Sequence, residues 1–458
     1  MRVADAQGRG GPHSDPPRPA APRVYALDVL LPQERGTAPV VVDANGARSG
    51  VEAQQRLYGD DRVQRAVLEA LAAAGDGTIV SLSQRSSMDL QDRFSAERLR
   101  RACGPGGGWY AAAEAYAPPG DPHARQRESV HEEPARELGI PLLRYEVGVL
   151  GDRPVLFGAD GRVAGDYGDW DPRGVVWPYA FDQRTVPLRA DLVCNPLAYA
   201  LPTTDKLLLA ALVPELLPAT RPAGPWLARG EKLAEAAEWA AGEDHVVVKP
   251  AVGRRSFGVV VVPGARFAEV AGRLGVVARD AHRLDVLARV ASIGMLWGQC
   301  GELSALVQPY VRPRLERNAG TGRWHAVVAR ATVLSDGWGV RCIDACKFVA
   351  PVPVGERAGR ASMIFTHSGD PLVERLSAAD EEAVNGCAVR FVAGLESAVD
   401  ARLGHGDDAA ALRAEADLLV GVFEEGSDLP VRGSAERLSG MPMGLDLVAA
   451  GYRWGRHG

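Results

Sequence analysis

Two periods of hydrophobic and polar positions alternate along the chain, and together they predict a mixed α/β protein. Short runs rich in Val, Leu and Ile, bounded by Gly, Pro, Asn or Asp, are typical of strands. Such runs lie at residues 25–31, 38–46, 77–83, 153–158, 174–179, 245–262, 303–311 and 325–348. The 325–348 run contains the turn SDGWG and is expected to form two strands.

Helical spacing separates these runs. Apolar residues three and four positions apart, with Gly at the end of each segment, predict helices. These segments cover residues 60–75, 132–139, 230–242 and 381–404. A further helix is expected to start near Thr204 or Asp205 and to stay short, because Pro214 and Pro218 interrupt it.

The order of the elements favours several domains. A strand, a helix and a strand follow one another between residues 25 and 83, which predicts a parallel α/β unit. Residues 1–22 are rich in Gly and Pro and are expected to be a disordered tail. The domains expected after it are an N-terminal α/β domain at 23–190, a central module at 191–350 and a helix-rich region at 351–458.

Composition narrows the functional classes. The chain has 458 residues, a formal net charge of −6 and no block of Lys and Arg, so nothing indicates nucleic-acid binding. No run of 18 apolar residues and no secretory signal are found, so we expect a cytoplasmic protein without a membrane partner. Its six cysteines are expected to be reduced. A small-molecule substrate is the default.

The segment HVVVKPAVGRRSFGVVVV, residues 245–262, carries the first chemical signal. A run of Val that ends on Lys249 is costly unless an anion meets the lysine. Gly253 and Gly258 allow a loop backbone to approach that anion closely, and Arg254 adds charge. A phosphate fits this description. The alternative is an ordinary hairpin with a solvated basic tip.

Four segments in order resemble the ATP-grasp superfamily: CNPLAYALPTTDKLLLA, LLPAT, VVVKPAVGRRSFGV and LVQPYV. The resemblance spans about residues 190–350. It implies an ATP-grasp-like α/β fold, in which an N-terminal α/β domain precedes a central nucleotide-gripping α+β module and a helix-rich C-terminal region. It also implies the use of ATP and Mg²⁺.

The resemblance implies roles for individual residues. Lys206 and Lys249 match the two lysines that reach nucleotide phosphates, and the glycine-rich loop that closes over them matches Gly253, Arg254, Ser256 and Gly258. The hinge beside the adenine matches Gln308, Pro309 and Tyr310, although Gln308 stands where the family often has Glu. Lys206 could equally be a solvated helix lysine.

Arg330 stands where related enzymes place an arginine that faces the phosphates or a carboxylate, so a catalytic role is implied for it together with Lys249. A strand arginine paired with an acid is the alternative.

The metal ligands remain unassigned from the sequence. The family holds Mg²⁺ with an acidic residue and a Glu-x-Asn motif, because this ion prefers hard oxygen ligands. That motif is not found, and Asp344, Glu424 and Glu425 are the candidates considered. Either the ligands are atypical or the site only binds nucleotide.

A polar segment after the strand at 38–46 offers a substrate site. The carboxyl end of a strand in an α/β domain is where ligands gather. Asn45, Arg48 and Ser49 could hold a substrate carboxylate, with Arg48 making a bidentate contact. A solvated loop ordered by its own turn chemistry is the alternative.

The function implied by the resemblance is ATP-dependent ligation of a small carboxylate to an amine, such as an amino acid or a short peptide, through an acyl phosphate. The poor match to central-metabolism ligases favours an enzyme of specialised metabolism. Two alternatives keep the nucleotide: an ATP-grasp-type kinase and a nucleotide-binding protein without ligase activity. A hydrolase without nucleotide is a third. Oligomeric state is not readable.

Overall fold

The computed structural model describes most of the predicted elements. The described residues are 21–33, 37–46, 57–84, 131–150, 153–159, 162–167, 169–179, 192–203, 206–222, 231–250, 260–269, 305–318, 322–350, 353 and 372–403. Within these ranges the strands form three sheets, and helices pack against them. The mixed α/β class predicted from the sequence is therefore confirmed.

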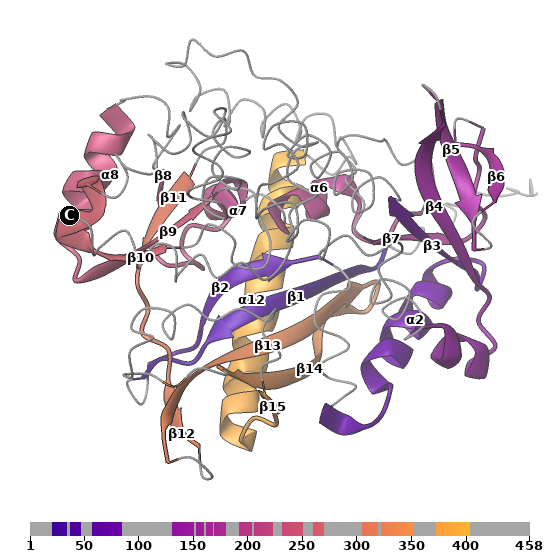
Figure 1. Cartoon of the computed structure of the whole chain (residues 1–458). Helices are drawn as coiled ribbons and strands as arrows, with labels where there is room; N and C mark the ends of the chain where they lie inside the picture. The colour runs from indigo at the N-terminus through magenta and orange to yellow at the C-terminus, as the bar shows by residue number, and fades with distance from the viewer. Residues whose placement is uncertain are drawn as a thin grey trace, which may run out of the picture.

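The largest sheet joins the two ends of the described chain (Figure 1). Its order is β15-β14-β13-β1-β2, with β12 paired to β13, and the pairs are antiparallel. The strands are β1 (Arg23–Leu30), β2 (Val40–Asn45), β12 (Leu315–Arg317), β13 (Trp324–Asp336), β14 (Gly339–Val349) and β15 (Leu372–Glu374). Strands from the start of the sequence thus lie beside strands about 300 residues later.

The parallel α/β unit predicted between residues 25 and 83 is wrong. β1 pairs antiparallel with both β2 and β13, whereas β3 (Ile79–Gln84) belongs to another sheet. The physical reason is that β1 is buried along most of its length and pairs with eight consecutive residues of β13. Succession in sequence does not fix which strands pair, because a long connection costs little more entropy than a short one.

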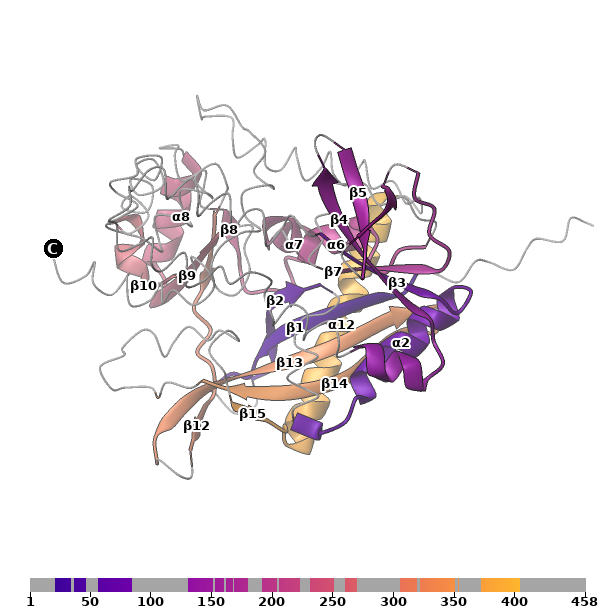
Figure 2. The same ribbon diagram turned by 45° about the vertical axis from the view of Figure 1, so that its right-hand side comes forward.

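Helix α12 (Ala378–Leu403) covers one face of the large sheet, as both views show (Figures 1 and 2). Its apolar side chains, including Phe391 and Leu395, pack against Tyr25, Leu27 and Val29 of β1 in the main core. This helix is the amphipathic segment predicted at 381–404. Among the described residues, no helix is long and apolar enough to cross a membrane.

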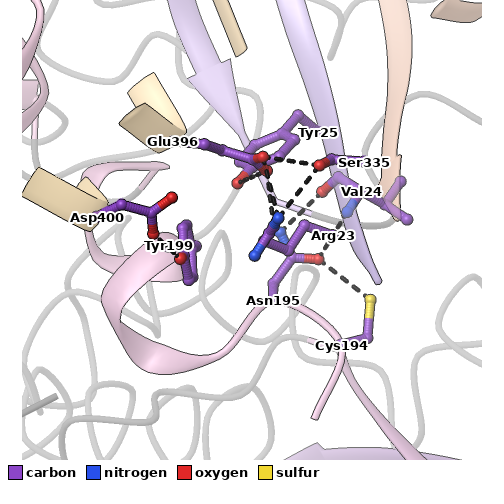
Figure 3. A network of polar contacts seen from close by, with 9 residues as sticks. All are labelled: Arg23, Val24, Tyr25, Cys194, Asn195, Tyr199, Ser335, Glu396 and Asp400. Carbon is purple, nitrogen blue, oxygen red and sulfur yellow. Dashed lines mark hydrogen bonds and ion pairs between the residues drawn. The ribbon is translucent and has the colours of Figure 1, made fainter. Parts of the chain in front are cut away.

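A polar network inside this interface ties β1 to α12 (Figure 3). Arg23 donates to both carboxylate oxygens of Glu396, at 2.7 and 3.1 Å. Tyr25 and Ser335 donate to the same carboxylate. Nearby, the side chain of Asn195 bonds both the N–H and the C=O of Val24, at 3.0 Å each. The network fixes the first strand of the chain in the sheet.

A four-stranded antiparallel sheet lies beside the β2 edge, on one side of the large sheet (Figure 1). Its order is β10-β9-β11-β8, and α8 (Glu231–Ala241) packs against it. The strands are β8 (Arg221–Pro222), β9 (His245–Pro250), β10 (Val260–Pro263) and β11 (Ala305–Pro309). The hairpin predicted from the valine runs at 245–262 is confirmed by the pairing of β9 with β10.

A five-stranded sheet lies on the other side (Figures 1 and 2). β4, β3 and β7 are parallel, while β5 and β6 continue it antiparallel. The strands are β3, β4 (Leu142–Leu150), β5 (Arg153–Gly158), β6 (Val163–Asp166) and β7 (Val175–Tyr179). Helix α2 (Arg62–Ala74) packs on this sheet and on β13 and β14, and so bridges the two. It matches the helix predicted at 60–75.

Short helices connect the sheets. They are α6 (Leu197–Ala200), the 3-10 helix η2 (Leu201–Thr203) and α7 (Lys206–Leu212). α7 ends before Pro214, as the sequence predicted. The predicted tail and the segment after Leu403 lie, apart from residues 21 and 22, outside the described residues.

Candidate functional site

The face of the large sheet turned away from α12 carries a row of polar side chains. Side chains alternate between the two faces of a strand, and the apolar set of β1, β13 and β14 lies on the α12 side. On the other face, Asp43, Asp28, Arg330 and Cys346 stand opposite one another on β2, β1, β13 and β14. Four strands that are distant in sequence therefore place their functional groups in one line.

Arg330 is held by Asp28. Its Nε and Nη2 donate to Asp28 Oδ1 at 2.8 and 2.6 Å, and both side chains are largely buried. The Asn45 amide lies 3.5 Å from the other carboxylate oxygen, Oδ2. A buried carboxylate requires such partners, because removing a charge from water is costly. This matches the alternative weighed for Arg330, a strand arginine paired with an acid.

Lys249 reaches across from the four-stranded sheet to the large one. It lies near the end of β9, and its Nζ donates to the backbone carbonyl of Val42 in β2 at 3.0 Å. Burial lowers the pKa of Lys249 to about 8; Lys206 acts in the same direction, and Asp43 and Asp28 oppose it. An anion placed here would restore the charged form of the lysine.

Lys206 approaches the same strand from α7. Its Nζ lies 3.8 Å from Asp43 Oδ1, and the lysine side chain is 15 % exposed. The two lysines predicted to bind phosphates thus come together at β2, one beside Val42 and the other beside Asp43. Their convergence could not be read from the sequence, because 43 residues separate them and neither contacts β2 by proximity in the chain.

The predicted hinge residues lie on β11, next to β9. Gln308 is buried and donates from Nε2 to Thr220 Oγ1 at 2.8 Å, which ties β11 to the segment before β8. The backbone N–H of Tyr310 donates to His245 O at 2.9 Å. Burial raises the pKa of Tyr310 to about 12. Together with Pro309, these residues are placed beside Lys249, two strand positions away in the β9–β11 ladder.

Some predicted site residues lie outside the described residues. These are Arg48, Ser49, Gly253, Arg254, Ser256 and Gly258, together with the metal candidates Glu424 and Glu425. Asn45 is described, and its contact is with Asp28. A role for it in substrate binding stays a prediction.

The sequence reasoning missed Asp28 and Asp43. Asp43 and Asn45 form an acid-x-Asn pair, and a spacing of two puts both side chains on one face of β2. Asp28 stands directly opposite Asp43. The Asp-x-Asn pattern was visible in VVVDANG, but the search for the family's Glu-x-Asn motif was directed to the sequence after Lys249. Only the sheet order brings residues 28–45 to this place.

The three side chains suit a hard cation. Mg²⁺ binds oxygen ligands, usually one or two carboxylates together with substrate phosphates and water. Asp28 and Asp43 supply two carboxylates and Asn45 an amide oxygen. Like charges directly opposite across a strand pair are unfavourable without a cation between or beside them, and this pair is flanked by Arg330, Lys206 and Lys249. Within the described residues, no cluster of three His, Cys, Asp or Glu forms another metal centre.

Asp344, the earlier metal candidate, lies elsewhere on the same face. It pairs with Thr332 in the β13–β14 ladder, next to the pair formed by Arg330 and Cys346. Asp344 is 7 % exposed, and its Oδ2 atom has no hydrogen-bond partner in the described part of the chain. Burial raises the pKa of Asp344 to about 6, opposed by a hydrogen bond with Tyr58. A buried acid that is neutral near pH 6 is a poor magnesium ligand.

Comparisons with known proteins give structural matches only. No family model matches the chain, and no curated protein does. A D-cycloserine synthetase structure matches with 15 % identity and a TM-score of 0.35, over 69 % of this chain and 82 % of that one. D-alanyl-alanine synthetase A from Vibrio cholerae matches with 14 % identity and a TM-score of 0.32, over 70 % and 81 %.

A glutathione synthetase-like effector from Globodera pallida matches with 10 % identity and a TM-score of 0.32, over 72 % of this chain and 74 % of that one. At these values the likeness carries no information about individual residues. The solved structures fall in the superfamily that the sequence motifs resemble, the ATP-grasp carboxylate–amine ligases.

Proposed function

We propose that the protein is an ATP-dependent ligase that joins a small carboxylate to an amine. The observation that carries this proposal is the convergence on β2 of two lysines from separate elements, directly beside the acidic pair Asp28 and Asp43. Cationic side chains for a polyphosphate and hard oxygen ligands for its metal ion are the two things that a site for Mg²⁺ and ATP requires.

The choice of lysine supports this use. The chain has 52 Lys and Arg, but only four of them are lysines, at positions 206, 232, 249 and 347. Lys206 and Lys249 are the two that meet at β2. Lysine presents a compact charge on a flexible stem and binds phosphate as a point charge, which arginine does not replace one for one.

The first chemical step is the transfer of a phosphoryl group to the substrate carboxylate. A carboxylate oxygen forms a bond to the γ-phosphorus of ATP, and the bond from that phosphorus to the bridging oxygen breaks, which leaves an acyl phosphate and ADP. Lys206 and Lys249 hold the phosphates in line, and the charge that develops on the oxygens is met by their ammonium groups. Most of the rate acceleration is positioning and electrostatic stabilisation.

The second step forms the amide. The amine nitrogen bonds to the acyl carbon, inorganic phosphate leaves with its oxygen, and the ammonium proton is released. The protein's task is to keep the acyl phosphate from water until the amine arrives. Amino acids or short peptides are the substrates that we propose, on the strength of the family resemblance.

Mg²⁺ would be held by Asp28 and Asp43, with Asn45 turning its amide so that the carbonyl oxygen faces the ion. When bound, the ion would neutralise phosphate charge and orient the terminal phosphate. Lys206, now 3.8 Å from Asp43, would then be free to contact a phosphate.

The experiment that tests the function is ADP release from ATP and Mg²⁺ by the purified full-length protein, with and without pools of amino acids. Mass spectrometry identifies any product. ADP release that depends on two added substrates, with a product whose mass equals their sum less one water, establishes the ligase. Release of ADP with a phosphorylated hydroxyl product would establish a kinase instead. Binding of ATP without turnover across amino-acid and peptide pools would refute the ligase.

A further inference from the structure

The Arg330–Asp28 pair has a geometry that separates the two oxygens of one carboxylate. Both N–H groups of the Arg330 guanidinium, Nε and Nη2, donate to Asp28 Oδ1. The second oxygen, Oδ2, is the one that lies toward Asn45. Asp28 therefore has one oxygen bound on the β13 side, and the other is directed toward β2, which carries Asp43 and Asn45.

The pair is placed to hold that orientation. The side chains of Arg330 and Asp28 are 4 % and 14 % exposed, and the two residues stand opposite each other in the β1–β13 ladder. The guanidinium also lies over the Phe348 ring at 5.7 Å. A rotation of the Asp28 carboxyl would break two hydrogen bonds in a buried site, which is costly.

We infer that Arg330 is a positioning residue for the cation site: it acts through Asp28, fixing which carboxylate oxygen faces the metal ion. This inference rests on the cation site of the proposed function. It gives Arg330 a task different from the phosphate contact that the family resemblance implies, because its donors Nε and Nη2 are already directed to Asp28. Residues that orient a metal ligand in this way typically change metal affinity by about 10–100-fold when altered.

The test measures Mn²⁺ binding by electron paramagnetic resonance on the full-length protein, with a non-hydrolysable ATP analogue present. Arg330→Lys keeps the positive charge but loses the planar fork of donors. We expect it to weaken Mn²⁺ binding by about 10–100-fold. Since the charge is unchanged, a loss of affinity reports orientation.

The matched control is Arg23→Lys. Arg23 lies on the same strand as Asp28 and donates in a similar two-bond manner to Glu396, but on the α12 side. It is expected to lower stability and to leave the Mn²⁺ affinity unchanged. Equal weakening in both variants would mean that the effect is a general loss of packing, and would overturn the inference.

A double-mutant cycle identifies the route. If Arg330 acts through Asp28, Arg330→Lys has no further effect on Mn²⁺ affinity in an Asp28→Asn background. Additive effects would overturn the inference, as would unchanged affinity in Arg330→Lys alone. Should Arg330→Lys not fold, Phe348→Leu loosens the guanidinium without altering any charge and is expected to give a smaller loss.

The readout needs no amide product, so it separates this inference from the ligase reaction. Mn²⁺ binding that weakens in Arg330→Lys supports the inference even if ligation is not found. If the wild-type protein does not bind Mn²⁺ with the nucleotide analogue, the cation site is refuted and the inference falls with it.

Discussion

Arg23 in the first strand and Glu396 in the last described helix form a two-bond ion pair across 373 residues of sequence (Figure 3). The side chains are 14 % and 9 % exposed. Tyr25 and Ser335 complete the hydrogen bonds of the carboxylate. We expect Glu396→Gln to lower the free energy of unfolding by about 3 kcal/mol, because it leaves the Arg23 charge buried without a counter-ion. Urea denaturation measures this.

An exposed pair provides the control for that variant. Arg312 donates to Asp244 at 2.7 Å, but both side chains are about 70 % exposed. Asp244→Asn should change the free energy of unfolding by less than about 1 kcal/mol, since water screens the pair. A comparable loss in both variants would contradict the importance given to the buried pair.

Asn195 is expected to be another support of β1. Its backbone has a φ of 53°, in the left-handed region, and its amide bonds both backbone groups of Val24. Asn195→Ala should lower the free energy of unfolding by about 2–3 kcal/mol, through two lost hydrogen bonds and the strain of a side chain at positive φ. Asn195→Gly loses the same bonds without the strain, so thermal and urea melts should find it about 1 kcal/mol more stable than the Ala variant.

Asp344 predicts a pH dependence of stability. Burial raises its pKa from 3.8 to about 6, so the folded protein holds a proton that the unfolded chain has lost. The wild type therefore loses stability as pH rises from about 4 to about 6, and Asp344→Asn does not. The difference in unfolding free energy between variant and wild type should grow by about 1–2 kcal/mol across this window. Parallel pH profiles would show that the carboxyl is not perturbed.

Lys249→Ala tests the phosphate site. Removing an ammonium that contacts a phosphate should weaken ATP binding by about 10–100-fold, as expected for a charge-assisted hydrogen bond. Isothermal titration measures the affinity. Lys347→Ala is the control, because Lys347 is also largely buried but is paired with Glu316 and Glu374. It should lose stability and keep its ATP affinity; unchanged affinity in Lys249→Ala would remove this lysine from the site.

The local elements followed from the sequence. The valine runs of β9 and β10, the heptad-like spacing of α12 and the short helix α7 before Pro214 were all predicted, because hydrophobic period and helix-breaking residues act over a few positions. The two lysines were also singled out, since each occurs in a short motif that resembles a known family. Local chemistry is written locally.

The sequence could not assign partners to strands. β1 and β2 were expected to lie in a parallel unit with β3, and instead they lie beside β13, about 300 residues later. Pairing is decided by the total area buried and hydrogen bonds made in the complete sheet, not by neighbouring residues. For the same reason Asp28 and Asp43 were not recognised as candidates for the cation site, although Asp43 and Asn45 already showed the spacing of such a pair.

What the sequence determined by itself was the kind of elements and the identity of the phosphate-binding lysines; what only the tertiary structure decided was the company they keep. Lys249 meets Val42, Lys206 meets Asp43, and Arg330 holds Asp28, in each case across more than 150 residues. Contacts of this range are set when sheets close around a common core, because only then do the faces that carry charge come together.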